Sequence, residues 1–211
     1  MDYPLYVEVE GERYPINTDF RVAIECGRVS EDETIGDYER GLAIIYLLFG
    51  EKGINAQEHY VKLLELAKKY LLCGNELEET NGKPDMDFIE DYSYIRASFR
   101  SDYGIKLEEE KIHWWEFMEL MNGLSNSELG NCCILNRIRN LRNYDTKDIK
   151  DAKLKSEINK AKEKFELKRN QKPIHHTQEQ RKNVNELLQK LNLRKEWYYG
   201  WKYNYRYRIR Y

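Results

Sequence analysis

Residues 91–105 read DYSYIRASFRSDYGI, and this stretch decides the fold. Together with a preceding phenylalanine, its apolar residues recur at intervals of four, three and four, which is one face of an α-helix: Phe88, Tyr92, Ile95 and Phe99. Asp87 with Glu90 three residues later predicts a capped beginning, and Gly104 supplies a left-handed end. We therefore predict a helix whose aromatic face lies in the core, with Phe99 buried.

A second aromatic block follows at residues 113–124, which read HWWEFMELMNGL. Trp114, Phe117, Met118 and Met121 form a second helical stripe, and Gly123 ends it. A short acidic segment joins the two blocks. The pattern predicts a hairpin of two helices that carries the core.

The residues before this pair predict a short β-hairpin and further helices. Leu5, Val7 and Val9 alternate with glutamates up to Gly11, which is typical of a strand followed by a turn. Helices are predicted over residues 19–26, over 37–49 with a stop at Gly50, from an N-cap at Asn55 to Gly74, and over 125–141. The expected fold class is mainly α, with an N-terminal β-hairpin followed by one helical domain over residues 1–144.

Residues 145–196 form a charged helical extension in this interpretation. Residues 145–168 predict a helix with a narrow apolar set, and a second helix follows Pro173. The two sets are Leu154, Ile158, Ala161 and Phe165, and Val184, Leu187, Leu188 and Leu191. Narrow stripes on charged helices are typical of segments that pack on a partner or a sister subunit. Packing against the chain's own domain fits the pattern equally well.

The last part, residues 197–211, is a basic aromatic tail. Here Tyr203, Tyr205, Tyr207 and Ile209 alternate with Asn204, Arg206, Arg208 and Arg210. Three interpretations are open: an edge strand, a segment that binds nucleic acid through arginine and tyrosine, or a disordered segment that folds on a protein partner. We favour a strand or a docking segment over nucleic-acid binding.

Charge is divided unevenly along the 211 residues. Residues 1–144 carry 16 Lys+Arg against 28 Asp+Glu, and residues 145–211 carry 19 against 9. Solvated outer faces of mixed Lys/Glu helices explain this most simply. The alternative is self-association, in which the basic back half of one copy binds the acidic front half of another.

Catalytic, metal and membrane signatures are missing from the sequence. The four cysteines match no zinc pattern, the four histidines form no H-E-x-x-H, and there is neither a P-loop nor a nucleophile elbow. We expect a protein that is not an enzyme and has no metal or cofactor. No apolar run approaches the roughly 18 residues of a membrane helix. With no secretory signal either, the expected location is the cytoplasm.

The two aromatic blocks, together with residues 14–21 (YPINTDFR), resemble a family of tail-assembly chaperones. The family is encoded in the tail modules of long non-contractile-tailed phages and prophages of Gram-positive bacteria, and the similarity runs over residues 3–165. The resemblance implies a protein that binds the helical tape-measure protein in the infected host and recruits tail-tube subunits. It also implies that the protein leaves before the virion is complete.

Candidate binding residues follow from adaptable aromatic and methionine side chains outside the predicted core faces or at their edges. They are Tyr94, Trp115 and Met118 in the aromatic blocks, and Tyr203, Tyr205 and Tyr207 in the tail. Two other classes stay open. One is a phage protein that inhibits or triggers a host defence complex, for instance a nucleoprotein, through Arg206, Arg208 and Arg210. The other is a minor structural component of the tail.

Overall fold

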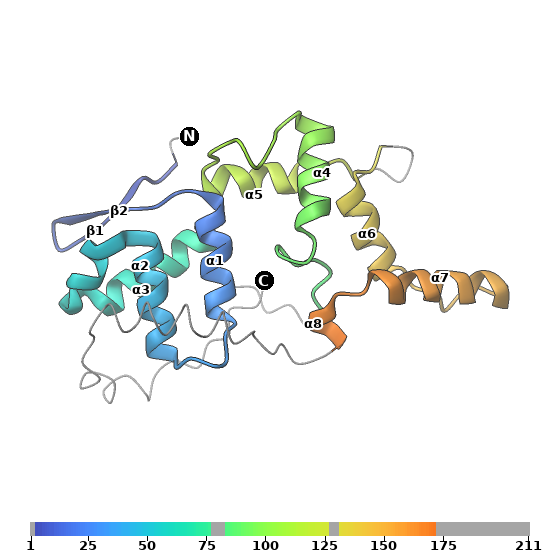
Figure 1. Ribbon diagram of the computed structural model, residues 1–211, viewed down its shortest axis with the longest axis horizontal. Helices are drawn as coiled ribbons and strands as arrows, with labels where there is room; N and C mark the ends of the chain where they lie inside the picture. The colour runs from blue at the N-terminus through green and yellow to red at the C-terminus, as the bar shows by residue number, and fades with distance from the viewer. Residues whose placement is uncertain (1–2, 77–82, 127–130, 172–211) are drawn as a thin grey trace. The chain divides into compact units, whose positions relative to one another are not determined.

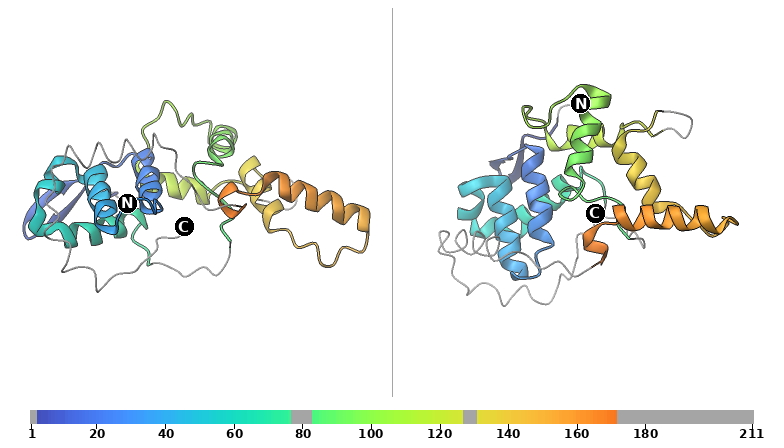
Figure 2. Two further views of the ribbon diagram at one scale, coloured as in Figure 1. Left: turned by 60° about the horizontal axis from the view of Figure 1, so that its bottom comes forward. Right: turned by 45° about the vertical axis from the view of Figure 1, so that its right-hand side comes forward.

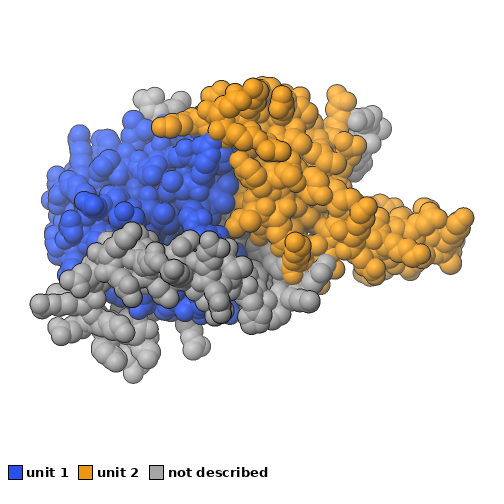
Figure 3. All heavy atoms as spheres, viewed as in Figure 1, with its two compact units in different colours: residues 1–79, 112–117, 175–211 blue, residues 80–111, 118–174 orange. Residues whose placement is uncertain are grey.

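The computed structural model describes residues 3–76, 83–126 and 131–171. The fold is mainly helical with an N-terminal two-stranded hairpin, as the sequence predicts (Figure 1). The chain divides into two compact units, residues 1–79 with 112–117 and 175–211, and residues 80–111 with 118–174 (Figure 3). We call them unit 1 and unit 2 and describe each by itself.

Unit 1 begins with an antiparallel hairpin of β1 (Tyr6–Val9) and β2 (Glu12–Pro15). Val9 pairs with Glu12, so the turn contains only Glu10 and Gly11, both with positive φ (52° and 84°). Two-residue turns of this kind match the right-handed twist of the strands, and they favour glycine at the second position.

The helices of unit 1 are α1 (Phe20–Ser30), α2 (Asp37–Asn55) and α3 (Tyr60–Leu71), with α2 packed between the other two (Figure 1). The Asp19 carboxylate caps α1 by accepting a bond from the N–H of Arg21 at 2.9 Å. The predicted stop at Gly50 is a kink (φ 65°, ψ −156°), beyond which helix resumes to Asn55. Asn55 was therefore wrongly predicted as an N-cap. A 3₁₀ turn, Gln57–His59, precedes α3 instead.

The core of unit 1 includes the first turn of α5 (Trp114–Asn122). Phe117 stacks on Phe20 with ring centroids 4.5 Å apart, and the Trp114 indole N–H donates to the Leu71 carbonyl at 2.9 Å. Backbone bonds also join the two segments, since the Trp114 N–H donates to the Thr18 carbonyl at 2.8 Å. The start of the second aromatic block thus completes the core of unit 1. The rest of α5 belongs to unit 2 with the first block, where the Tyr103 hydroxyl of α4 donates to the Leu120 carbonyl at 2.8 Å.

Unit 2 contains α4 (Tyr92–Tyr103), the rest of α5, α6 (Ile134–Asn143), α7 (Ala152–Phe165) and α8 (Lys168–Gln171) (Figure 2). Phe99 is fully buried, as predicted, and Gly104 ends α4 with φ 71°. Helices α4 and α6 pack together, and the Ser98 hydroxyl accepts a bond from the N–H of Leu135 at 3.1 Å.

Two predicted boundaries in unit 2 are wrong. Helix α4 begins at Tyr92 because the Asp87 carboxylate caps a separate turn, where it accepts bonds from Ile89 and Glu90. The helix predicted over residues 125–141 begins only at Ile134, and Asn126 and Cys132 before it form an isolated β-bridge. The described residues contain no helix that is long and apolar enough to cross a membrane.

Candidate protein-binding surface

Helix α7 carries an apolar stripe that the rest of its unit covers only in part. None of its side chains is buried, and Leu154 is 47% exposed. The other stripe members, Ile158, Ala161 and Phe165, are half-buried. Their spacing of four, three and four residues places all four on one side of the helix, in the d-a-d-a pattern of a coiled-coil seam. We call these four residues the α7 stripe.

Charged residues on both sides of the α7 stripe are mainly basic. In the same heptad frame, the flanking e and g positions hold Lys155, Glu157, Lys162 and Lys164. The whole helix has five lysines against two glutamates. Since flanking charges select the partner of a helical seam, this face suits an amphipathic helix with acidic borders.

Both ends of α7 are fixed by hydrogen bonds. The Asp151 carboxylate caps the N-terminus by accepting bonds from Lys153 at 2.8 Å and Leu154 at 3.2 Å. Near the C-terminus, Lys162 Nζ donates to the Tyr144 carbonyl at 2.5 Å. Figures 1 and 2 show α7 extending away from α4 and α6, to which it is joined near one end.

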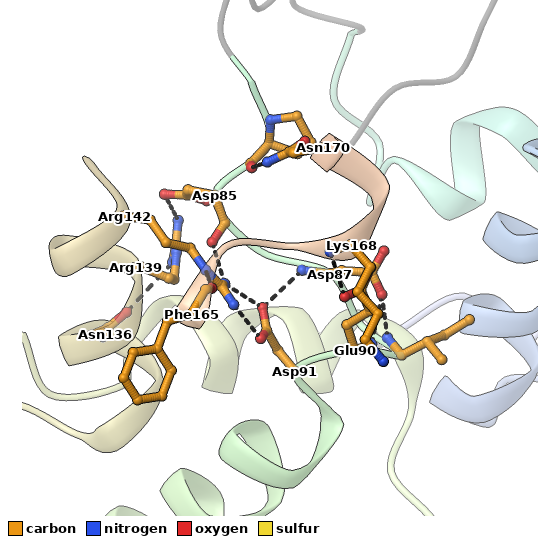
Figure 4. Close-up of polar contacts among 12 residues, drawn as sticks. Asp85, Asp87, Glu90, Asp91, Asn136, Arg139, Arg142, Phe165, Lys168 and Asn170 are labelled. Carbon is orange, nitrogen blue, oxygen red and sulfur yellow. Dashed lines mark hydrogen bonds and ion pairs between the residues drawn. The ribbon is translucent and has the colours of Figure 1, made fainter. Parts of the chain in front are cut away.

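A buried ion pair anchors the C-terminal end of α7 (Figure 4). Arg142 of α6 donates to both carboxylate oxygens of Asp91 at 2.6 and 2.8 Å, and its Nε donates to the Phe165 carbonyl at 2.7 Å. The Asp85 carbonyl accepts a further bond at 2.7 Å. The two side chains are 10% and 2% exposed, so loss of one partner would leave a buried charge uncompensated. One guanidinium therefore ties three segments of unit 2 together.

The segment after α7 is attached to the same region. The N–H of Lys168 donates to the Glu90 carboxylate at 2.8 Å, and the Asn170 amide donates to the Pro84 carbonyl at 3.2 Å (Figure 4). Leu167, between them, is 1% exposed. The α7 stripe is consequently presented on a helix with a firmly held C-terminal end.

Tyr94, Trp115 and Met118, the binding candidates in the aromatic blocks, are each half-buried. Trp115 belongs to unit 1, where its indole N–H donates to the Tyr70 carbonyl at 2.9 Å and its ring stacks on Tyr70. Tyr94 and Met118 belong to unit 2. Trp115 thus has a structural partner, and a binding role for the three stays a prediction.

The remaining candidates lie outside the described residues. They are the tyrosines and arginines of the tail, Tyr203, Tyr205, Tyr207, Arg206, Arg208 and Arg210. The second predicted stripe, from Val184 to Leu191, lies there too. Their roles stay predictions from the sequence.

In unit 1, a polar cluster joins the hairpin to the turn before α3. The Tyr14 hydroxyl donates to the Glu12 carboxylate at 2.9 Å and lies 2.7 Å from His59 Nδ1. Burial raises the pKa of Tyr14 to about 12, and the bond from Tyr14 lowers the pKa of Glu12. A phenol held in its neutral form is a poor nucleophile, so the cluster fastens β2 to the start of α3. In the described residues, no group of three or more His, Cys, Asp or Glu could hold a metal ion.

In the described residues, the fold and the α7 stripe define a mainly helical protein with a short hairpin and an apolar helix face that is only partly covered. The chain belongs to the family described as Bacteriophage Gp15 protein, whose family model matches residues 1–167. The expected phage origin is thereby confirmed. The match includes all of α7 and leaves out the tail. No curated protein and no solved structure matches the chain.

Proposed function

We propose that this phage protein is a tail-assembly chaperone without enzymatic activity. It binds the helical tape-measure protein in the cytoplasm of the infected host, recruits tail-tube subunits, and is absent from the mature virion. Membership of the phage family supports the phage origin that this proposal requires. The observation that carries the proposal is the α7 stripe, an apolar face with no buried residue on a helix fixed at both ends.

The physical requirement on such a chaperone explains why this surface is suitable. A long amphipathic helix exposes more contiguous apolar area than a soluble monomer normally tolerates. Many chaperone copies, each with a short apolar stripe, can cover that area through weak contacts, which allow the chaperone to dissociate later. The α7 stripe supplies one such seam, and the lysines beside it select acidic borders on the client.

Co-expression with the tape-measure protein tests the proposal. Leu154→Asp with Ile158→Asp adds two charges to the α7 stripe. We expect the soluble, co-purifying fraction of the tape-measure protein to fall at least about tenfold, since carboxylates would have to be desolvated in the seam.

The matched control is Ser156→Asp with Asn159→Asp, which adds the same charge to α7 outside the stripe. It should leave co-purification unchanged. If co-purification of the tape-measure protein falls equally in both variants, or in neither, the α7 stripe is not the binding face. Mass spectrometry of purified virions provides a separate test, because a minor structural component would be present there and a chaperone would not.

A second candidate function rests on the basic back half, with 19 Lys+Arg against 9 Asp+Glu. In it, the chain inhibits or triggers a host defence complex that contains nucleic acid, through Arg206, Arg208 and Arg210. The salt dependence of partner binding distinguishes the two functions. Phosphate-based binding falls steeply between about 50 and 200 mM salt, whereas apolar docking does not.

We also infer that the chain associates with itself, because residues 1–144 are acidic and residues 145–211 basic. Sedimentation velocity at low and high salt tests this. Contacts between oppositely charged halves should give oligomers that dissociate as salt rises. A strict monomer under both conditions at high protein concentration rules the association out.

A further inference from the structure

The two outer edges of the β-hairpin differ in how their backbone groups are used. The Ile16 N–H donates to the Leu5 carbonyl at 2.9 Å, and the register pairs Val7 with Tyr14. Because hydrogen-bonded pairs alternate with non-bonded pairs in an antiparallel ladder, odd-numbered residues of β1 bond to β2. The N–H and C=O groups of Tyr6 and Glu8 therefore point away from β2.

The outer edge of β2 is closed. Its outward-pointing residues are Arg13 and Pro15. The Arg13 carbonyl accepts a bond from Lys52 Nζ at 2.7 Å, and Pro15 has no N–H to donate. An added strand could not extend a ladder along this side.

The outer edge of β1 is open. Within residues 3–76, 83–126 and 131–171, the backbone groups of Tyr6 and Glu8 have no hydrogen-bond partner. The open stretch is bounded on one side by Pro4, whose carbonyl lies 3.1 Å from His113 Nε2. Beside the edge, Leu5 is 64% and Tyr6 47% exposed. Four backbone groups and the Leu5 side chain are thus available to a short extended segment, while the Arg13 guanidinium lies over the Tyr6 ring at 4.6 Å.

We propose that the outer edge of β1 is a strand-addition site, and that residues 203–210 of the same chain occupy it. Main-chain bonds to Tyr6 and Glu8 provide the affinity, as in other cases of β-augmentation. The inference is independent of the proposed chaperone function.

Alternation in the tail fits the two faces of β1. Side chains of Tyr6, Glu8 and Glu10 share one face, and those of Leu5, Val7 and Val9 share the other. With the tail paired in the matching register, its arginines lie beside the glutamates, and its tyrosines lie beside Leu5 and Val7. Opposite charges and aromatic–aliphatic pairs are both favourable across strands.

Charge and chain length support this occupant. The hairpin residues 6–15 carry three glutamates and one arginine, with Glu8 paired to Arg13, Glu10 to Lys62 and Glu12 to Lys52, whereas the tail after Glu196 contains no acidic residue. Residues 172–202, between the described part and the docking segment, span up to about 100 Å when extended. An attached segment of this reach has an effective concentration near the millimolar range, which favours intramolecular docking.

Occupancy of the site has a structural consequence. An open, apolar strand edge is a template for pairing with another chain, and proteins usually cover or charge such edges. Docking of the tail covers this one, and an extended segment from a partner must displace the tail to bind there.

Amide hydrogen exchange of the full chain tests the proposal. In the full chain, we expect the Tyr6 and Glu8 amides to be protected from exchange. In the triple variant Tyr203→Ser, Tyr205→Ser and Tyr207→Ser, the protection of these two amides should fall at least about tenfold. The amides of Val7 and Val9, which face β2, should remain protected in both proteins. They report that the hairpin itself is intact.

A matched control replaces two tyrosines outside the alternation, Tyr198→Ser with Tyr199→Ser, and should leave the exchange unchanged. Unprotected Tyr6 and Glu8 amides in the full chain overturn the proposal, as does protection that survives the triple substitution. Protection that rises with protein concentration assigns the site to the tail of a second copy, and overturns intramolecular docking.

Discussion

Helices α4 and α7 of unit 2 are built on the same sequence pattern but have different surroundings. In each case apolar residues recur at intervals of four, three and four, ending at Phe99 in the first and at Phe165 in the second, although Phe88, the first of the former set, lies before α4. Helix α4 buries Ile95, Ser98 and Phe99, whereas α7 buries no side chain at all. The spacing identifies the apolar face of a helix, and it does not reveal whether the same chain covers that face.

What separates the two helices is the presence of a packing neighbour distant in sequence. Along α4 lies α6, with a bond between Ser98 and Leu135 across 37 residues. Helix α7 contacts α6, whose Arg142 bonds the Phe165 carbonyl, and the segment just before α7 bonds to it at Asn159 and Lys162. A covered face contributes to folding stability and an uncovered one is available for binding, so substitutions in α4 and α7 should act on different properties.

The largest effect is expected in the covered face. Phe99→Ala should reduce the free energy of unfolding by about 3–5 kcal/mol, through lost transfer energy and the cavity that remains. Chemical denaturation measures this, and the exposed Arg96→Ala on the same helix is the control. A loss below about 1 kcal/mol would mean that α4 is no better packed than α7.

The anchor of α7 should give the next largest effect. Asp91→Ala leaves the Arg142 guanidinium buried without its carboxylate, and we expect a loss of about 3 kcal/mol. Glu108→Ala removes the exposed ion pair with Arg96, at 46% and 51% side-chain exposure, and should change stability by less than about 1 kcal/mol. Equal changes in the two variants would show that the Asp91 pair is effectively solvated.

Local signals predicted much of the fold correctly. Alternation identified the hairpin, the 3.6-residue period identified α1 to α4, and Gly104 ended α4 as expected. These features depend on the steric and hydrogen-bonding preferences of neighbouring residues, which a single sequence contains. An error occurred where a capping residue closed a separate turn, since the Asp87 carboxylate accepts bonds from Ile89 and Glu90 and α4 begins only at Tyr92.

Long-range pairings were not predictable in the same way. The pair of Asp91 with Arg142 joins residues 51 apart, and although Asp91 begins the first aromatic block, nothing in that block indicates Arg142 as its partner. The packing of Phe117 on Phe20 likewise moved the first turn of α5 into unit 1. The α7 stripe was visible in the sequence, but its exposure depends on which residues do not pack against it. Only the three-dimensional arrangement contains that information.

The pH dependence of stability tests the burial of Tyr14 in unit 1, and here the expected effect is smaller. Tyr14 has its pKa raised from 10.0 to about 12, with burial as the first cause. Between these values the unfolded chain releases the phenol proton while the folded chain keeps it, so stability should fall as pH rises from 10 to 12. The expected loss at pH 11 is about 1 kcal/mol.

Tyr14→Phe is the control for this titration. Other buried tyrosines also have raised pKa values, Tyr60 and Tyr70 among them, so the wild-type chain alone does not isolate Tyr14. The variant should be less stable at all pH values because its bonds to Glu12 and His59 are gone, and its stability should fall less steeply between pH 10 and 12. Parallel curves for the two proteins would show that the Tyr14 phenol is not desolvated.

The smallest expected effect on stability belongs to the α7 stripe itself. Leu154 is 47% exposed, so Leu154→Ala removes little buried area, and alanine is at least as good a helix former. We expect chemical denaturation to show a change within about 0.5 kcal/mol, while co-purification of the tape-measure protein falls. A loss above about 2 kcal/mol would mean that the stripe is covered by the chain's own residues. The two helices would then differ in degree only, and the binding surface would have to be sought elsewhere.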